Sequence, residues 1–130
     1  MILSDRRARV LCVDDDEESR DLLSTLMRFS GIEVKAVATA AQALSLIQAE
    51  CFDLYLLDAC LPVRDGFELC RRVRHRAPHT PILFFSGASE EVNTERGIDA
   101  GANAYVIKPD VDGLFEGIAQ FVLYAESEGA

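Results

Sequence analysis

Acidic residues in this sequence stand where apolar segments end. Asp14 and Asp15 follow the apolar segment 9–13 (RVLCV), and Asp58 closes the segment 53–58 (DLYLLD). Three carboxylates brought together repel one another and need a proton or a cation. Mg²⁺ suits such a set, because it binds through one or two carboxylates and keeps several waters.

Two more residues that could serve phosphoryl chemistry close later apolar segments. Ser86 ends 81–86 (PILFFS) and Lys108 ends 104–108 (AYVIK). Lysine offers a point charge that could pair with a carboxylate or a phosphoryl group, and serine offers a neutral hydroxyl donor. A carboxylate is already ionised at neutral pH, so it can act as a nucleophile without a base. The set therefore describes phosphoryl transfer to an aspartate, with cations neutralising charge on the transferred group.

Each of these residues also has an ordinary structural interpretation. Acids in the first turn of a helix interact favourably with its dipole, and Asp16, Glu17 and Glu18 are assigned that role. Asp58 alone could equally cap a turn, and Lys108 alone would be a solvated surface lysine. The combination favours a functional site, because four of the five expected strands end in a residue type that one phosphoryl site requires.

The spacing of apolar residues predicts the elements that position these side chains. Strands are expected at 9–13, 33–37, 53–58, 81–86 and 104–108, and helices at 19–30, 40–50, 66–74, 89–100 and in a terminal stripe from Val111 to Ala125. Val92 and Ile98 are the expected apolar anchors of the polar fourth helix. Gly113 and Gly117 weaken the last helix.

Alternating strands and helices predict an α/β fold with a parallel sheet covered on both faces. We expect a (βα)5 doubly wound, flavodoxin-like architecture with a five-stranded parallel sheet in the order 2-1-3-4-5, because the half-polar segment 33–37 suits an edge. In that order the first and third strands are neighbours, so the three carboxylates converge at the carboxyl ends of the strands.

The composition limits the classes of function. The 130 residues fit one domain, expected at 9–125 between a short leader (1–8) and a polar tail (126–130). A net charge of -9 argues against sequence-independent binding to the phosphate backbone of nucleic acids. No apolar run approaches the ~18 residues that span a bilayer, and the N-terminus has no signal-peptide pattern.

The cysteines, Cys12, Cys51, Cys60 and Cys70, include no C-x-x-C pair. We expect reduced thiols of a cytoplasmic protein, mostly filling the core. A zinc site is not expected, because the two histidines, His75 and His79, fall in a polar loop region far from any cysteine pair.

Four motifs together resemble the receiver domain of two-component response regulators, of the single-domain, chemotaxis type: VDDD (13–16), LLDACLPVRDG (56–66), FFSGA (84–88) and AYVIKP (104–109). The resemblance extends roughly from Arg9 to Ala125. It implies a cytoplasmic signalling switch that accepts a phosphoryl group from the phosphohistidine of a sensor histidine kinase or a histidine phosphotransfer protein. Such a domain is not an enzyme with a released product; it catalyses only its own phosphorylation and dephosphorylation.

The resemblance also implies a role for each site residue. Asp58 would be the phosphoacceptor and, with Asp15, a direct ligand of Mg²⁺, for which Mn²⁺ could substitute. Asp14 would act on the ion largely through water, and the backbone carbonyl of Cys60 would complete the protein ligands. Lys108 would pair with Asp58 and then with the phosphoryl oxygens.

The resemblance further implies a switch. Ser86 would supply the switch hydroxyl and Tyr105 the switch aromatic, reshaping the face made by the fourth helix, fifth strand and fifth helix. The Lys108–Pro109 bond is expected to be cis, and Pro62 and Gly66 are expected to set the turn after Asp58. Output would pass to a protein target through that face, with a homodimer on phosphorylation as an option, and without DNA or membrane contact.

The sequence departs from the family pattern at several positions. Ser86 replaces the commoner threonine, Gly87 follows it, and Asp110 stands where an apolar residue is frequent, which puts an ordered start of the last helix in question. The main alternative function is a receiver-like interaction module that is not phosphorylated. A hydrolase would need a cap insertion, and a flavin-binding domain would need a phosphate loop where this chain is acidic.

Overall fold

The computed structural model describes residues 7–123 and shows five strands alternating with five helices. The strands are β1 (Arg9–Val13), β2 (Glu33–Val37), β3 (Leu54–Leu57), β4 (Ile82–Ser86) and β5 (Ala104–Ile107). The helices are α1 (Glu17–Phe29), α2 (Ala40–Ala49), α3 (Gly66–Arg76), α4 (Glu91–Asp99) and α5 (Val111–Ile118), the last continued by a π-helical segment, Ala119–Leu123. Most of the predicted leader, Ala125 and the predicted tail lie outside the described residues.

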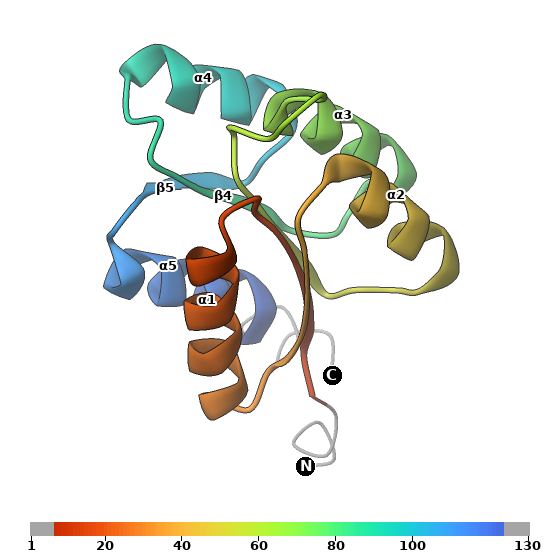
Figure 1. Ribbon diagram of the computed structural model, residues 1–130, viewed down its shortest axis with the longest axis vertical. Helices are drawn as coiled ribbons and strands as arrows, with labels where there is room; N and C mark the ends of the chain where they lie inside the picture. The colour runs from red at the N-terminus through yellow and green to blue at the C-terminus, as the bar shows by residue number, and fades with distance from the viewer. Residues whose placement is uncertain (1–6, 124–130) are drawn as a thin grey trace.

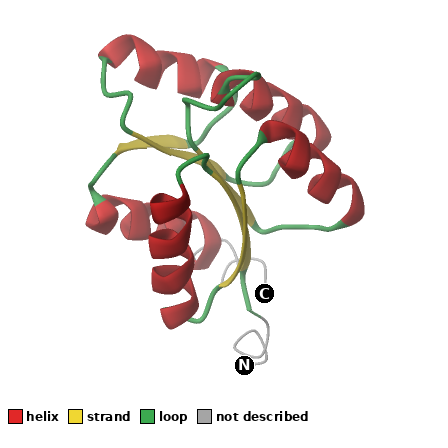
Figure 2. Ribbon diagram, viewed as in Figure 1, coloured by secondary structure: helices red, strands yellow, loops and turns green. Residues whose placement is uncertain are grey.

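The strands form one parallel sheet in the order β2-β1-β3-β4-β5, which confirms the predicted fold. The sheet lies between two helical layers: α2, α3 and α4 on one face, and α1 with α5 on the other (Figures 1 and 2). None of the helices in the described part of the chain is long and apolar enough to cross a bilayer.

Alternate residues of each central strand belong to two separate hydrophobic cores, one on each face of the sheet. Leu11, Leu57 and Phe84 pack toward α2 and α3, whereas Cys12 and Leu56 pack with side chains of α1 and α5. Because β1, β3 and β4 are buried on both faces, they read as nearly continuous apolar runs. Their backbones are therefore fixed at the point where the polar residues begin.

Several expectations about local structure are wrong. Val92 and Ile98 do not anchor α4, since their exposed fractions are 53% and 46%; the buried residue of that helix is Gly97. Asp110 does not disturb the start of α5, because its carboxylate accepts a hydrogen bond from the Gly113 backbone N–H at 2.9 Å and caps the helix.

The prediction that both histidines lie in a polar loop is also wrong for His75, which lies in the last turn of α3. The cysteines are all free, as predicted, but only Cys12 and Cys70 are buried, and Cys51 and Cys60 are exposed. Burial raises the pKa of Cys12 to about 12 and that of Cys70 to about 11, so both are inert core thiols.

Candidate functional site

The register of the sheet brings the two acidic strand ends together. Val13 pairs with Leu57, so Asp14 and Asp58 each stand one residue beyond the same pair. The Asp58 backbone N–H donates to the Val13 carbonyl at 2.9 Å and extends the ladder by one bond. The carboxylates thus start from adjacent, hydrogen-bonded backbone positions.

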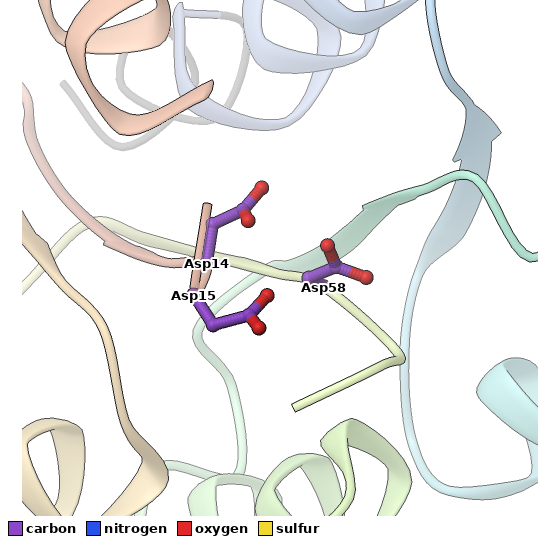
Figure 3. A group of neighbouring side chains, drawn as sticks. All are labelled: Asp14, Asp15 and Asp58. Carbon is purple, nitrogen blue, oxygen red and sulfur yellow. The ribbon is translucent and has the colours of Figure 1, made fainter. Parts of the chain in front are cut away.

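Asp14, Asp15 and Asp58 form one carboxylate cluster (Figure 3). One oxygen from each lies within 4.8 Å of the others. Asp14 and Asp58 are buried, and Asp15 is exposed. Oxygen donors at this spacing, with one side open to solvent, fit a hard divalent cation that keeps some of its waters.

Lys108 lies between the two buried carboxylates. Its Nζ donates to Asp14 Oδ2 at 2.7 Å and to Asp58 Oδ2 at 3.1 Å, and a longer contact of 3.4 Å reaches Ser19 Oγ. Partial burial works against the charged form, but the hydrogen bond to Asp14 and the charge of Asp58 outweigh it and raise the Lys108 pKa. Lys108 is therefore a cation at neutral pH.

Burial raises the pKa of Asp14 above its usual value, against the opposing effect of its hydrogen bond to Lys108. Its Oδ1 also accepts from the Asp16 backbone N–H at 3.0 Å. Asp16 caps α1 by accepting from Ser19, and Glu17 and Glu18 lie in the first turn of that helix, as predicted. The sequence did not predict that Ser19, in the first turn of α1, would lie 3.4 Å from the Lys108 amine.

Asp58 is held on both carboxylate oxygens. Its Oδ1 accepts from the Ser86 hydroxyl at 2.8 Å and from the Cys60 backbone N–H at 3.0 Å, while Oδ2 accepts from Lys108. Ser86 itself is fully buried and accepts from the Ala88 backbone N–H at 3.2 Å. The structure thus joins four of the predicted site residues, Asp14, Asp58, Ser86 and Lys108, in one network.

Tyr105 is connected to that network through the loop after β4. Its hydroxyl donates to the Ala88 carbonyl at 2.6 Å, and its ring stacks on Phe84 with centroids 5.4 Å apart. A continuous path of hydrogen bonds therefore runs from Asp58 through Ser86 and Ala88 to Tyr105.

The loop after Asp58 departs in detail from the expectation. Val63, with φ at 67°, adopts the left-handed conformation that the turn requires, next to Pro62. Gly66 instead begins α3, where a β-carbon would collide with the Asp58 carbonyl and come within 2.7 Å of the Ala59 Cα. Gly66 thus allows α3 to pack directly on the backbone of the site. The Lys108–Pro109 bond is cis, as predicted.

The fold and the cluster define a flavodoxin-like α/β protein with an acidic, cation-compatible site at the carboxyl edge of its sheet. The family model of the response regulator receiver domain matches residues 10–119. The chain belongs to that family, which confirms the resemblance to a response regulator receiver domain.

Curated relatives include the transcriptional regulatory protein GltR of Pseudomonas aeruginosa, 37% identical over 77% of this chain and 42% of that protein. The response regulator MprA of Mycolicibacterium vanbaalenii is 36% identical over 78% of this chain and 44% of that protein. The chain therefore spans less than half the length of these relatives. Among solved structures, a CheY-like receiver domain protein of Methanospirillum hungatei is 33% identical, with a TM-score of 0.88 over 95% of this chain and 99% of the other.

Proposed function

We propose that this protein is a phosphorylation-dependent switch of a two-component system, with Asp58 as the phosphoacceptor. The donor would be the phosphohistidine of a sensor histidine kinase or of a histidine phosphotransfer protein. The observation that supports this most is the network in which one carboxylate, on a fixed strand end, contacts both a cationic amine and a buried hydroxyl.

In the proposed transfer, an Asp58 carboxylate oxygen attacks phosphorus as the bond from phosphorus to the histidine nitrogen breaks. The product is an aspartyl phosphate, and the histidine nitrogen leaves with the bonding electrons. Lys108, which donates a hydrogen bond to the Asp58 carboxylate before the transfer, would neutralise charge on the phosphoryl oxygens. The Ser86 hydroxyl would exchange its bond to Asp58 Oδ1 for one to a phosphoryl oxygen.

Asp15 and Asp58 would hold Mg²⁺ directly, Asp14 would act largely through water, and the Cys60 carbonyl would complete the protein ligands. Mn²⁺ is a chemically reasonable substitute. When bound, the ion supplies positive charge that offsets the repulsion between the carboxylates and an incoming phosphoryl group.

Movement of Ser86 would break the path that now holds Tyr105 through Ala88. The Tyr105 ring would turn inward and alter the face formed by α4, β5 and α5, and hydrolysis of the aspartyl phosphate would restore it. This face would contact a downstream protein, or a second copy of the chain after phosphorylation, without direct contact to DNA. The cytoplasm, where histidine kinases present their phosphohistidine, is the expected location.

The test is the intact mass after incubation with acetyl phosphate and Mg²⁺. Wild type should gain one phosphoryl group, Asp58→Asn should gain none, and the control Asp21→Asn, on the exposed surface of α1, should behave as wild type. Failure of wild type to gain mass with either Mg²⁺ or Mn²⁺ would favour the alternative function, an interaction module that is not phosphorylated.

A further inference from the structure

The helices α2 and α3 lie side by side on one face of the sheet (Figure 1). A groove between them is lined by none of the three clustered carboxylates. It begins as a hollow of about 460 Å³ and is continued by a second hollow of about 420 Å³, with Ile47, Gln48 and Arg76 lining both. The second hollow reaches Phe52 and Thr80, which precede β3 and β4, so the groove extends toward the amino ends of the strands.

The two walls of the groove differ in chemistry. From α2 come the partly buried Leu44 and also Ile47, of which only 7% is exposed. From α3 come four basic side chains at the spacing of a single helical face, Arg71, Arg72, His75 and Arg76. The groove therefore has one narrow apolar side and a cationic rim, in a chain whose net charge is -9.

Hydrogen bonds that stabilise the fold explain only some of the basic residues of α3. Arg74, on the same helix, has a structural role, since its guanidinium donates to the carbonyls of Ala77, Thr80 and Gly101. Arg76 donates to the Ile47 carbonyl at 3.3 Å, at the end of α2. Basic residues in the last turn also interact favourably with the helix dipole.

Those reasons do not extend to Arg71 and Arg72, which lie in the middle of α3. Arg72 approaches Glu68 at 3.6 Å, and Arg71 makes no hydrogen bond or ion pair within residues 7–123. Both are exposed, and like charges four residues apart, such as Arg72 and Arg76, destabilise a helix. These contacts offset the charge of α3 only in part, since Arg71 has no partner among residues 7–123 and Arg72 has only the long contact to Glu68.

We propose that the α2–α3 groove binds an acidic amphipathic helix of a partner protein. Apolar side chains of that helix would contact Leu44 and Ile47, as a helix does in the groove between two others. Its carboxylates would face Arg71, Arg72 and Arg76. Because the chain as a whole is acidic, an acidic partner is repelled elsewhere and directed to this face.

Other polyanions fit the groove less well. Glu50 and Glu68 belong to its lining, so a continuous chain of phosphates would meet carboxylates at both ends. An anionic membrane would have to overcome the repulsion of the whole chain. The apolar side chains of the groove, Leu44 and Ile47, moreover, have no charged or polar group that could bind a phosphate.

The probe is a fluorescent peptide of about four helical turns, with leucines on one face and glutamates beside them. Fluorescence anisotropy would give its Kd for the unphosphorylated protein, and ¹⁵N chemical shifts would locate it. We expect the shifts at α2 and α3, and binding about tenfold weaker for Arg71→Glu. The matched control, Arg28→Glu on exposed α1, should change the Kd less than about twofold.

Three outcomes would overturn the proposal: no saturable binding of the peptide, equal weakening by both charge reversals, or equal binding of a scrambled peptide that has the same composition but no apolar face. Tighter binding of heparin, or of phosphatidylglycerol vesicles, than of the peptide would overturn it in favour of a polyanion or a membrane. None of these results depends on phosphorylation of Asp58, so the proposed switch stands or falls separately.

Discussion

The carboxyl ends of the central strands and the outer edge of the sheet are built differently. At the centre, Asp14, Asp58 and Ser86 expose only 2%, 7% and 0% of their surface, and their side chains are hydrogen-bonded. At the outer edge, Ile98 of α4 and Ile107 of β5 are 46% and 39% exposed. The centre is closely packed and polar, whereas the edge leaves apolar side chains in water.

This difference suits a division of labour. Chemistry on a carboxylate needs groups held in fixed positions, whereas a response needs an element with two arrangements of similar free energy. We propose Tyr105 as an element of the second kind, because its hydroxyl donates to the Ala88 carbonyl in the loop after β4 and its ring stacks on Phe84. If this interpretation is correct, changes at the centre should have larger effects than changes at the edge.

Lys108→Met should have the largest effect. It removes the amine that contacts both Asp14 and Asp58 and would neutralise the transferred group. We expect phosphoryl uptake from acetyl phosphate to slow by about 100-fold or more, as when a single donor to a developing anion is removed. Lys35→Met, which breaks only a surface pair with Glu50, is the control. Uptake by Lys108→Met within about twofold of wild type would remove Lys108 from the mechanism.

Gly66→Ala should destabilise the centre by about 3 kcal/mol, the upper range for an overpacked core. The added β-carbon meets backbone atoms of Asp58 and Ala59, which cannot move aside without displacing the strand end. Urea unfolding would measure the loss. Gly87→Ala is the control, because a β-carbon there meets open space. A loss below about 1 kcal/mol would mean that the site backbone is more compliant than its contacts suggest.

Sequence reasoning succeeded at the centre because one pattern carries both fold and chemistry. Apolar strands buried on both faces are recognisable from composition, and the residue that ends each strand is then placed by the parallel register alone. Asp14, Asp58, Ser86 and Lys108 were found in this way, and the structure brings them together.

The same reasoning failed at the edge, where burial depends on partners distant in sequence. In α4 the large residues Val92 and Ile98 are exposed, and Gly97 is buried because the rings of Phe84 and Tyr105 fill the space beside it. The spacing of large apolar residues in a sequence does not predict that a glycine is buried. The expectation for Asp110 is wrong for a different, local reason, since its carboxylate accepts from the Gly113 N–H three residues later and caps α5.

Mg²⁺ should stabilise the protein only through the centre. At a concentration tenfold above its Kd, the ion should add about 1.4 kcal/mol to the free energy of unfolding. Asp15→Ala should lose most of this gain, because it removes the proposed direct ligand that is open to solvent. Asp21→Ala, exposed on α1, should keep it. Thermal unfolding with and without Mg²⁺ is the measurement, and an unchanged gain in Asp15→Ala would refute the ligand assignment.

Gly97→Ala tests the edge with the same chemical change as Gly66→Ala and should have the smallest effect. The new β-carbon would lie 2.9 Å from a Tyr105 ring atom and 3.1 Å from one of Phe84, so a ring has to shift. Ring atoms yield more readily than a strand backbone, and alanine recovers about 1 kcal/mol of helix propensity. We therefore expect a net loss of about 1 kcal/mol or less in urea, together with altered NMR signals of the Tyr105 ring. A loss as large as that of Gly66→Ala would mean that Tyr105 is as tightly fixed as Asp58, and the edge could not then be the part that moves.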